Sequence, residues 1–302
     1  EGTSNITASL GTTTSNSLSL TVSNPLASIA ITPTSTSITI GATTQYTATG
    51  TYLDSSTNDI TTSVTWNTSA SDSVSISAVG LATALDAGNV NITATLGSIT
   101  SNSASLVVLP MFAYITNLTA NTVTVCTVDL DTGSLGSCQD SGAGAIFNSP
   151  VGMHLSIDEA FIYISNAGDN TITVCSVDAN DGLLSGCIAT GSGFNQPTRI
   201  DFNSAGTKAY VANEADDQIS VCDVDTATGA LSACSLTGSG MITTNDIALN
   251  ASATKAYIAD FNSNAVFVCS INTSTGLFTS CSDSGVGAIF DNTNKITLNA
   301  TG

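Results

Sequence analysis

Apolar and polar residues alternate along the whole chain in short segments separated by clusters of Gly, Asp, Asn and Ser. Clear examples in the first third are residues 28–32, 44–48, 63–66 and 90–94. A period of two over a few residues, bounded by turn-forming residues, predicts half-buried antiparallel β-strands. We therefore expect an all-β chain whose first third folds as a β-sandwich.

The first region contains a repeat that indicates tandem domains. The sequence that runs from Asn5 to Val22 returns 86 residues later, from Asn91 to Val108. A repeat of this length is a domain period. Residues 1–24 contain only the end of that period, so we expect a partial domain there, completed either by upstream sequence or by another chain.

Residues 25–110 resemble the bacterial immunoglobulin-like (Ig-like) domain of group 2, the extracellular module of the invasin and intimin type. The residues that carry this resemblance are Ile29-Ala-Ile31-Thr-Pro33, Gly41, Gln45-Tyr46, Gly50-Thr-Tyr52, Asp59-Ile-Thr61, Val64-Thr-Trp66, Val79-Gly80-Leu81-Ala-Thr-Ala84, Gly88 and Val90-Asn-Ile-Thr-Ala94. The resemblance implies a sandwich with Trp66 in its core. It also implies that residues 1–24 correspond to the last two strands of an earlier domain, with an uncovered core face and free strand edges.

Residues 111–302 contain a different repeat, marked by tyrosines at intervals of 49, 47 and 47 residues. These tyrosines are Tyr114, Tyr163, Tyr210 and Tyr257. After each tyrosine come an alternating segment that ends in Cys, a Thr-Gly or Asp-Gly turn, and a second Cys. A further strand ends each unit, at residues 153–156, 199–203, 246–250 and 295–299. Four strands per unit at this period predict the blades of a β-propeller.

The eight cysteines fall into four pairs, each separated by twelve positions. The pairs are Cys126/Cys138, Cys175/Cys187, Cys222/Cys234 and Cys269/Cys281. Each pair flanks a turn, so its two sulfurs can meet across a hairpin at the short distance that a disulfide requires. Zinc sites instead use cysteines that lie closer together in sequence. We therefore expect one disulfide per blade, and an extracellular location at the cell surface.

The segment Ala209-Tyr-Val-Ala-Asn213 and its three copies resemble the YVTN family of β-propeller repeats, which occur in lactonase-like propellers and in microbial surface-layer proteins. Propellers of this family often have about seven blades, whereas this chain has four units. Residues 295–299 could pair with the first unit and close a ring of four blades. An open array that continues beyond Gly302 is the alternative.

Charge excludes nucleic acid as a partner and disfavours an anionic membrane surface. The chain has four Lys and Arg against 23 Asp and Glu, for a formal net charge of −19. Nucleic-acid binding requires a basic patch, and an anionic membrane surface also attracts cations. No apolar run approaches the roughly 20 residues of a transmembrane helix. We expect neither nucleic-acid binding nor membrane insertion.

Candidates for catalysis are few. His154 is the only histidine, and it lies on a predicted inner strand near Arg199 of the next unit. A lactonase-like interpretation would place both at a central channel, with Asp201 or Asp246 as acid and base. Since that chemistry usually draws on more cationic and polar residues than this chain has, we expect no catalytic site, no enzyme activity and no cofactor.

Two acidic clusters could bind Ca²⁺, which prefers several oxygen ligands. These are Asp129-x-Asp131-x-Gly133 and the pair Asp216-Asp217. A turn in which an aspartate caps its own backbone explains the first pattern equally well. No metal site is therefore assigned.

The sequence as a whole favours an extracellular structural subunit of a bacterial surface filament or layer. We expect it to self-associate into a homopolymer through β-rich contacts, including strand addition by residues 1–24. The alternatives are a cell-surface adhesin whose propeller binds a host or cell-surface ligand, and a lactonase-like enzyme. Turnover that depends on His154 or Arg199 would favour the enzyme, and stoichiometric binding of a soluble ligand would favour the adhesin.

Overall fold

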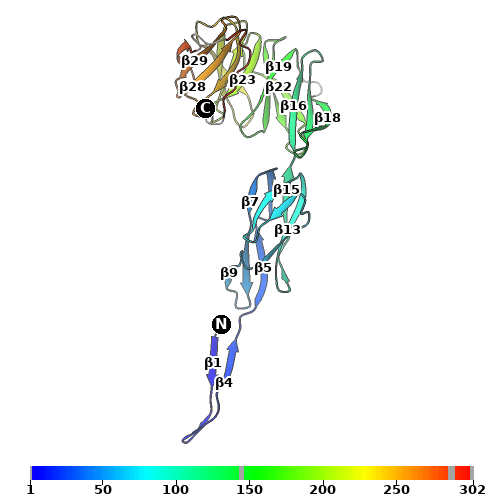
Figure 1. The fold of residues 1–302 in the computed structure, drawn as a ribbon, viewed down its shortest axis with the longest axis vertical. Helices are drawn as coiled ribbons and strands as arrows, with labels where there is room; N and C mark the ends of the chain where they lie inside the picture. Colours follow the sequence, from blue (N-terminus) through cyan, green and yellow to red (C-terminus); the bar gives the residue numbers. More distant parts are fainter. Residues whose placement is uncertain (1, 143–145, 285–289, 300–302) are drawn as a thin grey trace. The chain divides into compact units, whose positions relative to one another are not determined.

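The computed structural model of the chain describes residues 2–142, 146–284 and 290–299 (Figure 1). Those residues form thirty β-strands and no helix, which confirms the all-β prediction. Accordingly, the described part of the chain contains no helix with the length and apolar character needed to span a membrane. The chain divides into two compact units, Glu1–Met111 and Phe112–Gly302.

Most of the first unit is an Ig-like sandwich built from strands β5 to β15. One sheet has the order β10-β13-β15-β6 with β14 beside β13, and the others have the orders β11-β12-β7 and β5-β8-β9. The strands are β5 (Leu26–Thr32), β6 (Ser35–Thr39), β7 (Thr43–Gln45), β8 (Thr47–Tyr52), β9 (Thr57–Asp59), β10 (Thr65–Thr68), β11 (Val74–Ile76), β12 (Leu81–Ala84), β13 (Gly88–Leu96), β14 (Ile99–Thr100) and β15 (Ala104–Leu109).

Alternate residues of these strands are buried, as the period of two predicts. In β13, for example, Val90, Ile92 and Ala94 face the core while the residues between them do not. Trp66 is buried in the same core, and its indole Nε1 donates a hydrogen bond to the Thr61 carbonyl at 3.0 Å. The burial of Trp66 agrees with the expectation from the Ig-like resemblance.

Ahead of the sandwich, residues 2–22 form an isolated hairpin. Strand β1 (Gly2–Ile6) pairs with β4 (Leu18–Val22), and the short strands β2 (Ser9–Leu10) and β3 (Thr13–Thr14) form its tip. The hairpin has the same strand register as the pair β13 and β15, which holds the equivalent residues 86 positions later. Ser4 pairs with Leu20, and the equivalent Val90 pairs with Leu106. Leu106 is fully buried, but Leu20 is 49% exposed.

The second unit consists of four antiparallel sheets, each of which joins its strands in chain order. We call them the first to the fourth sheet (Figure 1, green to red). The first has three strands, β16 (Met111–Asn117), β17 (Thr122–Val128) and β18 (Leu135–Ser141). The others have four each: β19 (Pro150–Leu155), β20 (Phe161–Asn166), β21 (Thr171–Val177) and β22 (Leu184–Thr190); β23 (Pro197–Phe202), β24 (Lys208–Asn213), β25 (Gln218–Val224) and β26 (Leu231–Thr237); β27 (Thr244–Leu249), β28 (Lys255–Asp260), β29 (Ala265–Ile271) and β30 (Phe278–Asp283).

Consecutive sheets pack face to face through three apolar clusters. The cluster between the second and third sheets, for example, contains Tyr163 and Val174 from one side and Val211 and Leu231 from the other. Equivalent positions of the repeat form the clusters between the first and second sheets and between the third and fourth. The repeated sequence therefore produces a repeated interface, as in a propeller.

The recurring Asn of the repeat ties the second and third sheets to the loops that precede them. The Oδ1 of Asn166 accepts a hydrogen bond from the backbone N–H of Asn148, and its Nδ2 donates to the Thr173 hydroxyl. Asp260 replaces Asn in the fourth sheet and accepts a hydrogen bond from the N–H of Ile242 in the same way. These buried polar groups are satisfied within the interface, as burial requires.

The eight cysteines form four disulfides, one in each sheet of this unit. They are Cys126–Cys138, Cys175–Cys187, Cys222–Cys234 and Cys269–Cys281, and each joins the last two strands of its sheet. These last strands lie at a sheet edge, where pairing is otherwise one-sided. The disulfides therefore link the two strands at the outer edge of each sheet.

The prediction of a closing strand at residues 295–299 is wrong, because the structure assigns no strand to residues 290–299. Two backbone N–H groups of this segment donate to side chains instead of to a neighbouring strand. That of Ile296 donates to the Asp246 carboxylate, and that of Asn292 donates to the Asn264 side chain. The segment therefore packs beside the fourth sheet without extending a ladder.

Candidate functional site

The innermost strands of the second, third and fourth sheets bring together the four residues that the sequence singled out. His154 on β19 places its Nε2 3.5 Å from the Asp201 carboxylate on β23. Arg199, also on β23, places its Nε 3.6 Å from the Asp246 carboxylate on β27. The four residues form two separate pairs, each of which bridges two adjacent sheets.

The close approach of the inner strands explains this pairing. At Gly152 on β19, a Cβ atom would lie 2.0 Å from the Thr198 carbonyl oxygen of β23, so only glycine fits there. Each aspartate also bonds to the backbone further along the chain. Asp201 accepts a hydrogen bond from the N–H of Leu249, and Asp246 accepts one from the N–H of Ile296. The carboxylates therefore act as links between sheets.

The geometry around His154 gives it two protein partners. Its Nδ1 lies 2.6 Å from the Leu155 carbonyl, and its Nε2 faces Asp201. Its ring also packs against Phe202, with the ring centroids 5.4 Å apart. An imidazole whose two nitrogens both face protein acceptors is held in place. This arrangement suits a positioning role at the interface better than proton transfer to a substrate.

The pair of Arg199 and Asp246 has a similar character. At 3.6 Å it is an ion pair without a hydrogen bond, and the buried Arg199 Nε has no acceptor among the described residues. Asp246 also accepts a hydrogen bond from the N–H of Ile247 at 2.9 Å. The carboxylate is thus occupied by backbone donors as well as by the guanidinium.

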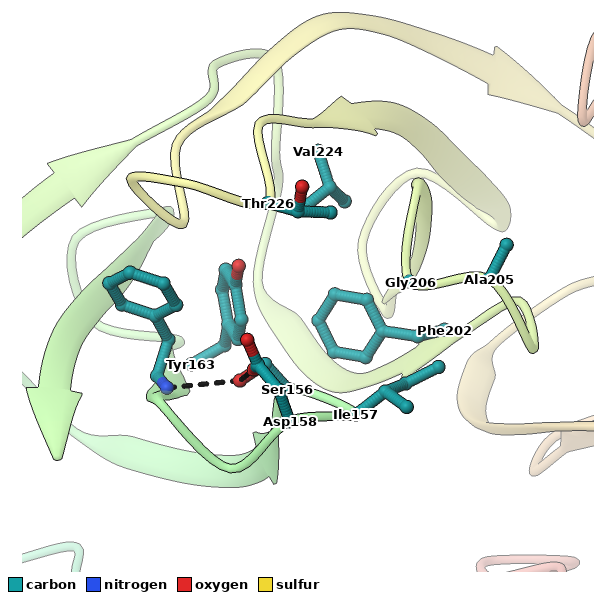
Figure 2. A pocket seen from close by; sticks show the side chains of 10 residues that line it. Ser156, Ile157, Asp158, Tyr163, Phe202, Ala205, Gly206, Val224 and Thr226 are labelled. Atoms are coloured by element: carbon teal, nitrogen blue, oxygen red, sulfur yellow. Dashed lines mark hydrogen bonds between the residues drawn. The ribbon is translucent and has the colours of Figure 1, made fainter. Parts of the chain in front are cut away.

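A pocket that the sequence analysis missed lies between the second and third sheets. Its volume is about 490 Å³, and Figure 2 shows the ten side chains around it. The aromatic side chains of Phe161, Tyr163 and Phe202 line it, and the Phe161 N–H donates a hydrogen bond to the Ser156 hydroxyl at 2.9 Å. The other lining residues are Ile157, Asp158, Ala205, Gly206, Val224 and Thr226. One feature of the sequence could have indicated this pocket. Phe161 is an aromatic residue at the repeat position that is Lys208 and Lys255 in the later units.

Electrostatics limit what this pocket accepts. The Ser156 hydroxyl, which donates to the Asp158 carboxylate, lowers the pKa of Asp158. Burial, together with the negative charges of Asp158 and Asp225, raises the pKa of Tyr163 to about 12. Near neutral pH the pocket therefore contains an ionised carboxylate and a neutral phenol. These groups fit a neutral or cationic ligand and disfavour an anion.

Each of the two predicted acidic clusters contains an aspartate that accepts a hydrogen bond from another residue of the chain. Asp129 accepts a hydrogen bond from the Thr132 N–H at 2.8 Å, as expected of an aspartate that caps a turn, and this bonding lowers its pKa. Asp216 accepts a hydrogen bond from the Asn195 side chain at 2.8 Å. Among the described residues, no three His, Cys, Asp or Glu side chains are grouped closely enough to hold a metal ion.

Two family models match consecutive parts of the chain. Residues 25–108 match the bacterial Ig-like domain (group 2), and residues 109–242 match the family described as lactonase, 7-bladed beta-propeller. These matches confirm the order expected from the sequence, an Ig-like domain followed by a lactonase-type propeller. The second model describes seven blades, so it does not confirm a closed ring of four blades.

One curated relative and two solved structures are similar to this chain in part. Ice-binding protein 1 of Shewanella frigidimarina is 44% identical over 98 residues, which are 31% of this chain and 11% of that protein. A functionally unknown protein from Desulfotomaculum acetoxidans is 18% identical, with 92% of this chain and 90% of that chain covered and a TM-score of 0.48. The periplasmic gluconolactonase of Pseudomonas aeruginosa is 14% identical, with coverages of 79% and 76% and a TM-score of 0.47. At these identities, neither structure assigns an activity to this chain.

Proposed function

We propose that this chain, with its group 2 Ig-like domain and lactonase-type propeller repeats, is a non-catalytic structural subunit of an extracellular surface filament or layer. An extracellular setting is supported by the pairing of all eight cysteines, since disulfides persist in oxidising compartments. It is also supported by the match over 98 residues to a protein named for binding ice. The inner-strand charges, engaged with each other and with the backbone, support the absence of catalysis.

The observation that carries the proposal is the exposed face of the β1–β4 hairpin. Its apolar residues are Ile6, Leu18, Leu20 and Val22, and all four are exposed. The equivalent residues of β13 and β15 are Ile92, Ala104, Leu106 and Val108, and all four are buried. A continuous exposed apolar face next to free strand edges favours association with another β-structure.

Substitution on the two faces of this hairpin tests the proposal. In the antiparallel pair, Leu20 lies on the apolar face and Thr21 on the opposite face. Negative-stain electron microscopy of the purified chain should show regular assemblies for the wild type and for Thr21→Asp, and dispersed particles for Leu20→Asp. Dispersed wild-type particles at every concentration would contradict the proposal.

A second candidate, a ligand-binding head of an adhesin, is favoured by the pocket between the second and third sheets. Its aromatic side chains and its one carboxylate suit a neutral ligand with hydroxyl donors. Calorimetric titration with neutral oligosaccharides, in wild type and in Asp158→Asn, separates this function from the first. Saturable binding that the variant weakens would support an adhesin.

A further inference from the structure

Each contact between consecutive sheets of the second unit uses the same positions of the repeat. We call the side of a sheet that meets the following sheet its forward face, and the side that meets the preceding sheet its rear face. On the forward face of the second sheet lie Tyr163, Val174 and Phe194. On the rear face of the third sheet lie Val211 and Leu231. Forward and rear faces are therefore complementary wherever two sheets of this kind meet.

A polar contact recurs at the same place in all three interfaces. The first residue of the outermost strand donates its backbone N–H to a hydroxyl of the preceding sheet. The pairs are Leu184 to Ser141 at 2.7 Å, Leu231 to Thr190 at 2.6 Å, and Phe278 to Thr237 at 2.8 Å. A bond that recurs three times identifies the register in which two sheets of this repeat dock.

The rear face of the first sheet is open. Leu135 holds the position of Leu184 and Leu231, yet it is 53% exposed whereas Leu184 is 7% exposed. Ile115 is likewise exposed, although its counterparts Ile164 and Val211 are fully buried. A Cβ built at Gly133 meets no atom within 4 Å, but one at the equivalent Gly182 would contact the Phe112 ring. Among the described residues, nothing covers this face.

The forward face of the fourth sheet is open in the matching way. Phe290 holds the position of Phe147, Phe194 and Met241. It is 39% exposed, whereas Phe194 is 6% exposed. Tyr257 and Val268 are also partly exposed, although Tyr210 and Val221 of the third sheet are buried. The chain thus presents one uncovered forward face and one uncovered rear face of the same repeat.

We infer that the forward face of the fourth sheet in one copy of the chain docks on the rear face of the first sheet in a second copy. The three interfaces within the unit specify the contacts. Phe290 and Val268 pack on Leu135 and Ile115 of the other copy, and the Leu135 N–H donates to the Ser284 hydroxyl.

A further bond of this contact follows from the first interface of the unit. The Tyr114 hydroxyl donates to the Gly182 carbonyl at 3.1 Å. Where the contact follows this first interface, the Tyr257 hydroxyl of one copy reaches the Gly133 carbonyl of the other. The equivalent Tyr163 hydroxyl of the second interface has no partner among the described residues. The inferred interface thus has the apolar centre and the few hydrogen bonds that are typical of specific protein contacts.

This contact is heterologous, because two different surfaces of the chain meet. If the rotation between two copies lets both pairs of open faces meet at once, the result is a closed dimer. With another rotation each copy binds a further one, and an open chain of copies forms. The inference deepens the proposed self-association by naming a second surface, and it does not depend on the β1–β4 hairpin.

Sedimentation velocity of the full chain tests the inference in a Leu20→Asp background, which removes association through the hairpin. The parent of this series should sediment as a dimer, and not as a monomer or a large assembly, at micromolar concentration. Leu135→Asp and Phe290→Asp should each weaken association by about tenfold or more, since each places a charge in the apolar centre. The matched control is Ile188→Asp on β22, which changes a side chain with 55% exposure that lies on neither open face.

Mixing the two variants gives the decisive result. The Leu135→Asp chain retains its forward face and the Phe290→Asp chain retains its rear face, so a mixture should form a one-to-one dimer that neither variant forms alone. A monomeric parent, or variants that associate as the parent does, would overturn the inference. Since the hairpin is tested separately by Leu20→Asp, failure here leaves the proposed function standing. If Leu135→Asp abolishes the assemblies and Leu20→Asp does not, the hairpin is not the surface through which the chain self-associates.

Discussion

Asp246 and Arg199 form an ion pair between two sheets in which the anion is far more buried than the cation. The carboxylate side chain is 4% exposed and the guanidinium side chain 39% exposed, at a separation of 3.6 Å. The buried partner has the larger desolvation penalty, so it depends more on the contact.

Arg199→Met should therefore lower the free energy of unfolding by about 1–3 kcal/mol, because it leaves a buried carboxylate without its cation. The double variant with Asp246→Asn should recover part of this loss. Urea unfolding provides the measurement. Lys208→Met is the control, because its partner Asp223 is 51% exposed and such surface pairs contribute less than about 1 kcal/mol. Equal losses in the two single variants would contradict the expected difference.

Gly229 lies in the turn of the third sheet and packs against the second sheet. Its φ is +73°, and a Cβ would lie 2.8 Å from a Val174 methyl carbon and 2.9 Å from the Phe161 ring. Gly229→Ala should lower stability by about 2–4 kcal/mol, which combines the cost of positive φ with overpacking.

Gly193 is the matched control for this variant, since its φ is +82° and no atom lies within 4 Å of a built Cβ. Gly193→Ala should cost about 1–2 kcal/mol, for the backbone alone. Thermal unfolding of the two variants measures the difference. Similar transition temperatures would show that the Gly229 turn does not pack against the neighbouring sheet.

Tyr163 has a buried hydroxyl without a hydrogen-bond partner among the described residues. At neutral pH, Tyr163→Phe should leave stability unchanged or raise it by about 1 kcal/mol, because it removes an unsatisfied polar group. Tyr114→Phe should instead lose about 0.5–1.5 kcal/mol, because the Tyr114 hydroxyl bonds to the Gly182 carbonyl. Denaturant unfolding at neutral pH compares the two variants, and a larger loss for Tyr163→Phe would contradict this account.

Alkaline pH gives a second test of Tyr163. Burial raises its pKa to about 12, whereas an unfolded tyrosine titrates near about 10. The stability that its protonated form contributes is fully present below pH of about 10 and is lost as the pH rises towards 12. Tyr163→Phe should lose less stability over this window than the wild type, as measured by denaturant unfolding at a series of pH values.

The disulfide Cys222–Cys234 closes a loop with a sequence separation of 12 in the third sheet. The chain-entropy model gives about 3 kcal/mol for a loop near this size, and less where the hairpin is already formed. Replacing both cysteines by Ala should therefore lower the free energy of unfolding by about 1–3 kcal/mol in urea. No change would show that the hairpin is fully restricted without its covalent link.

The sequence alone determined the features that depend on near neighbours in the chain. Alternation around Val90 and Ile92 predicted a strand with one buried face, because successive side chains of a strand point to opposite sides. Tyrosines at regular intervals predicted four similar units, because each unit repeats the same local chemistry. The Ig-like and YVTN resemblances then supplied the order of the two folds.

Only the tertiary structure decided the features that depend on which sheets meet. The lactonase-like interpretation placed His154 and Arg199 at one channel with Asp201 or Asp246. Only the stacking of the inner strands pairs His154 with Asp201 and Arg199 with Asp246. The same applies to the pocket beside Tyr163, and to the burial of Leu184 where the equivalent Leu135 is exposed. Equivalent repeat positions differ in burial because a side chain is buried only where a neighbouring sheet covers it. The sequence of one unit specifies its own strands and not the sheet that packs against them.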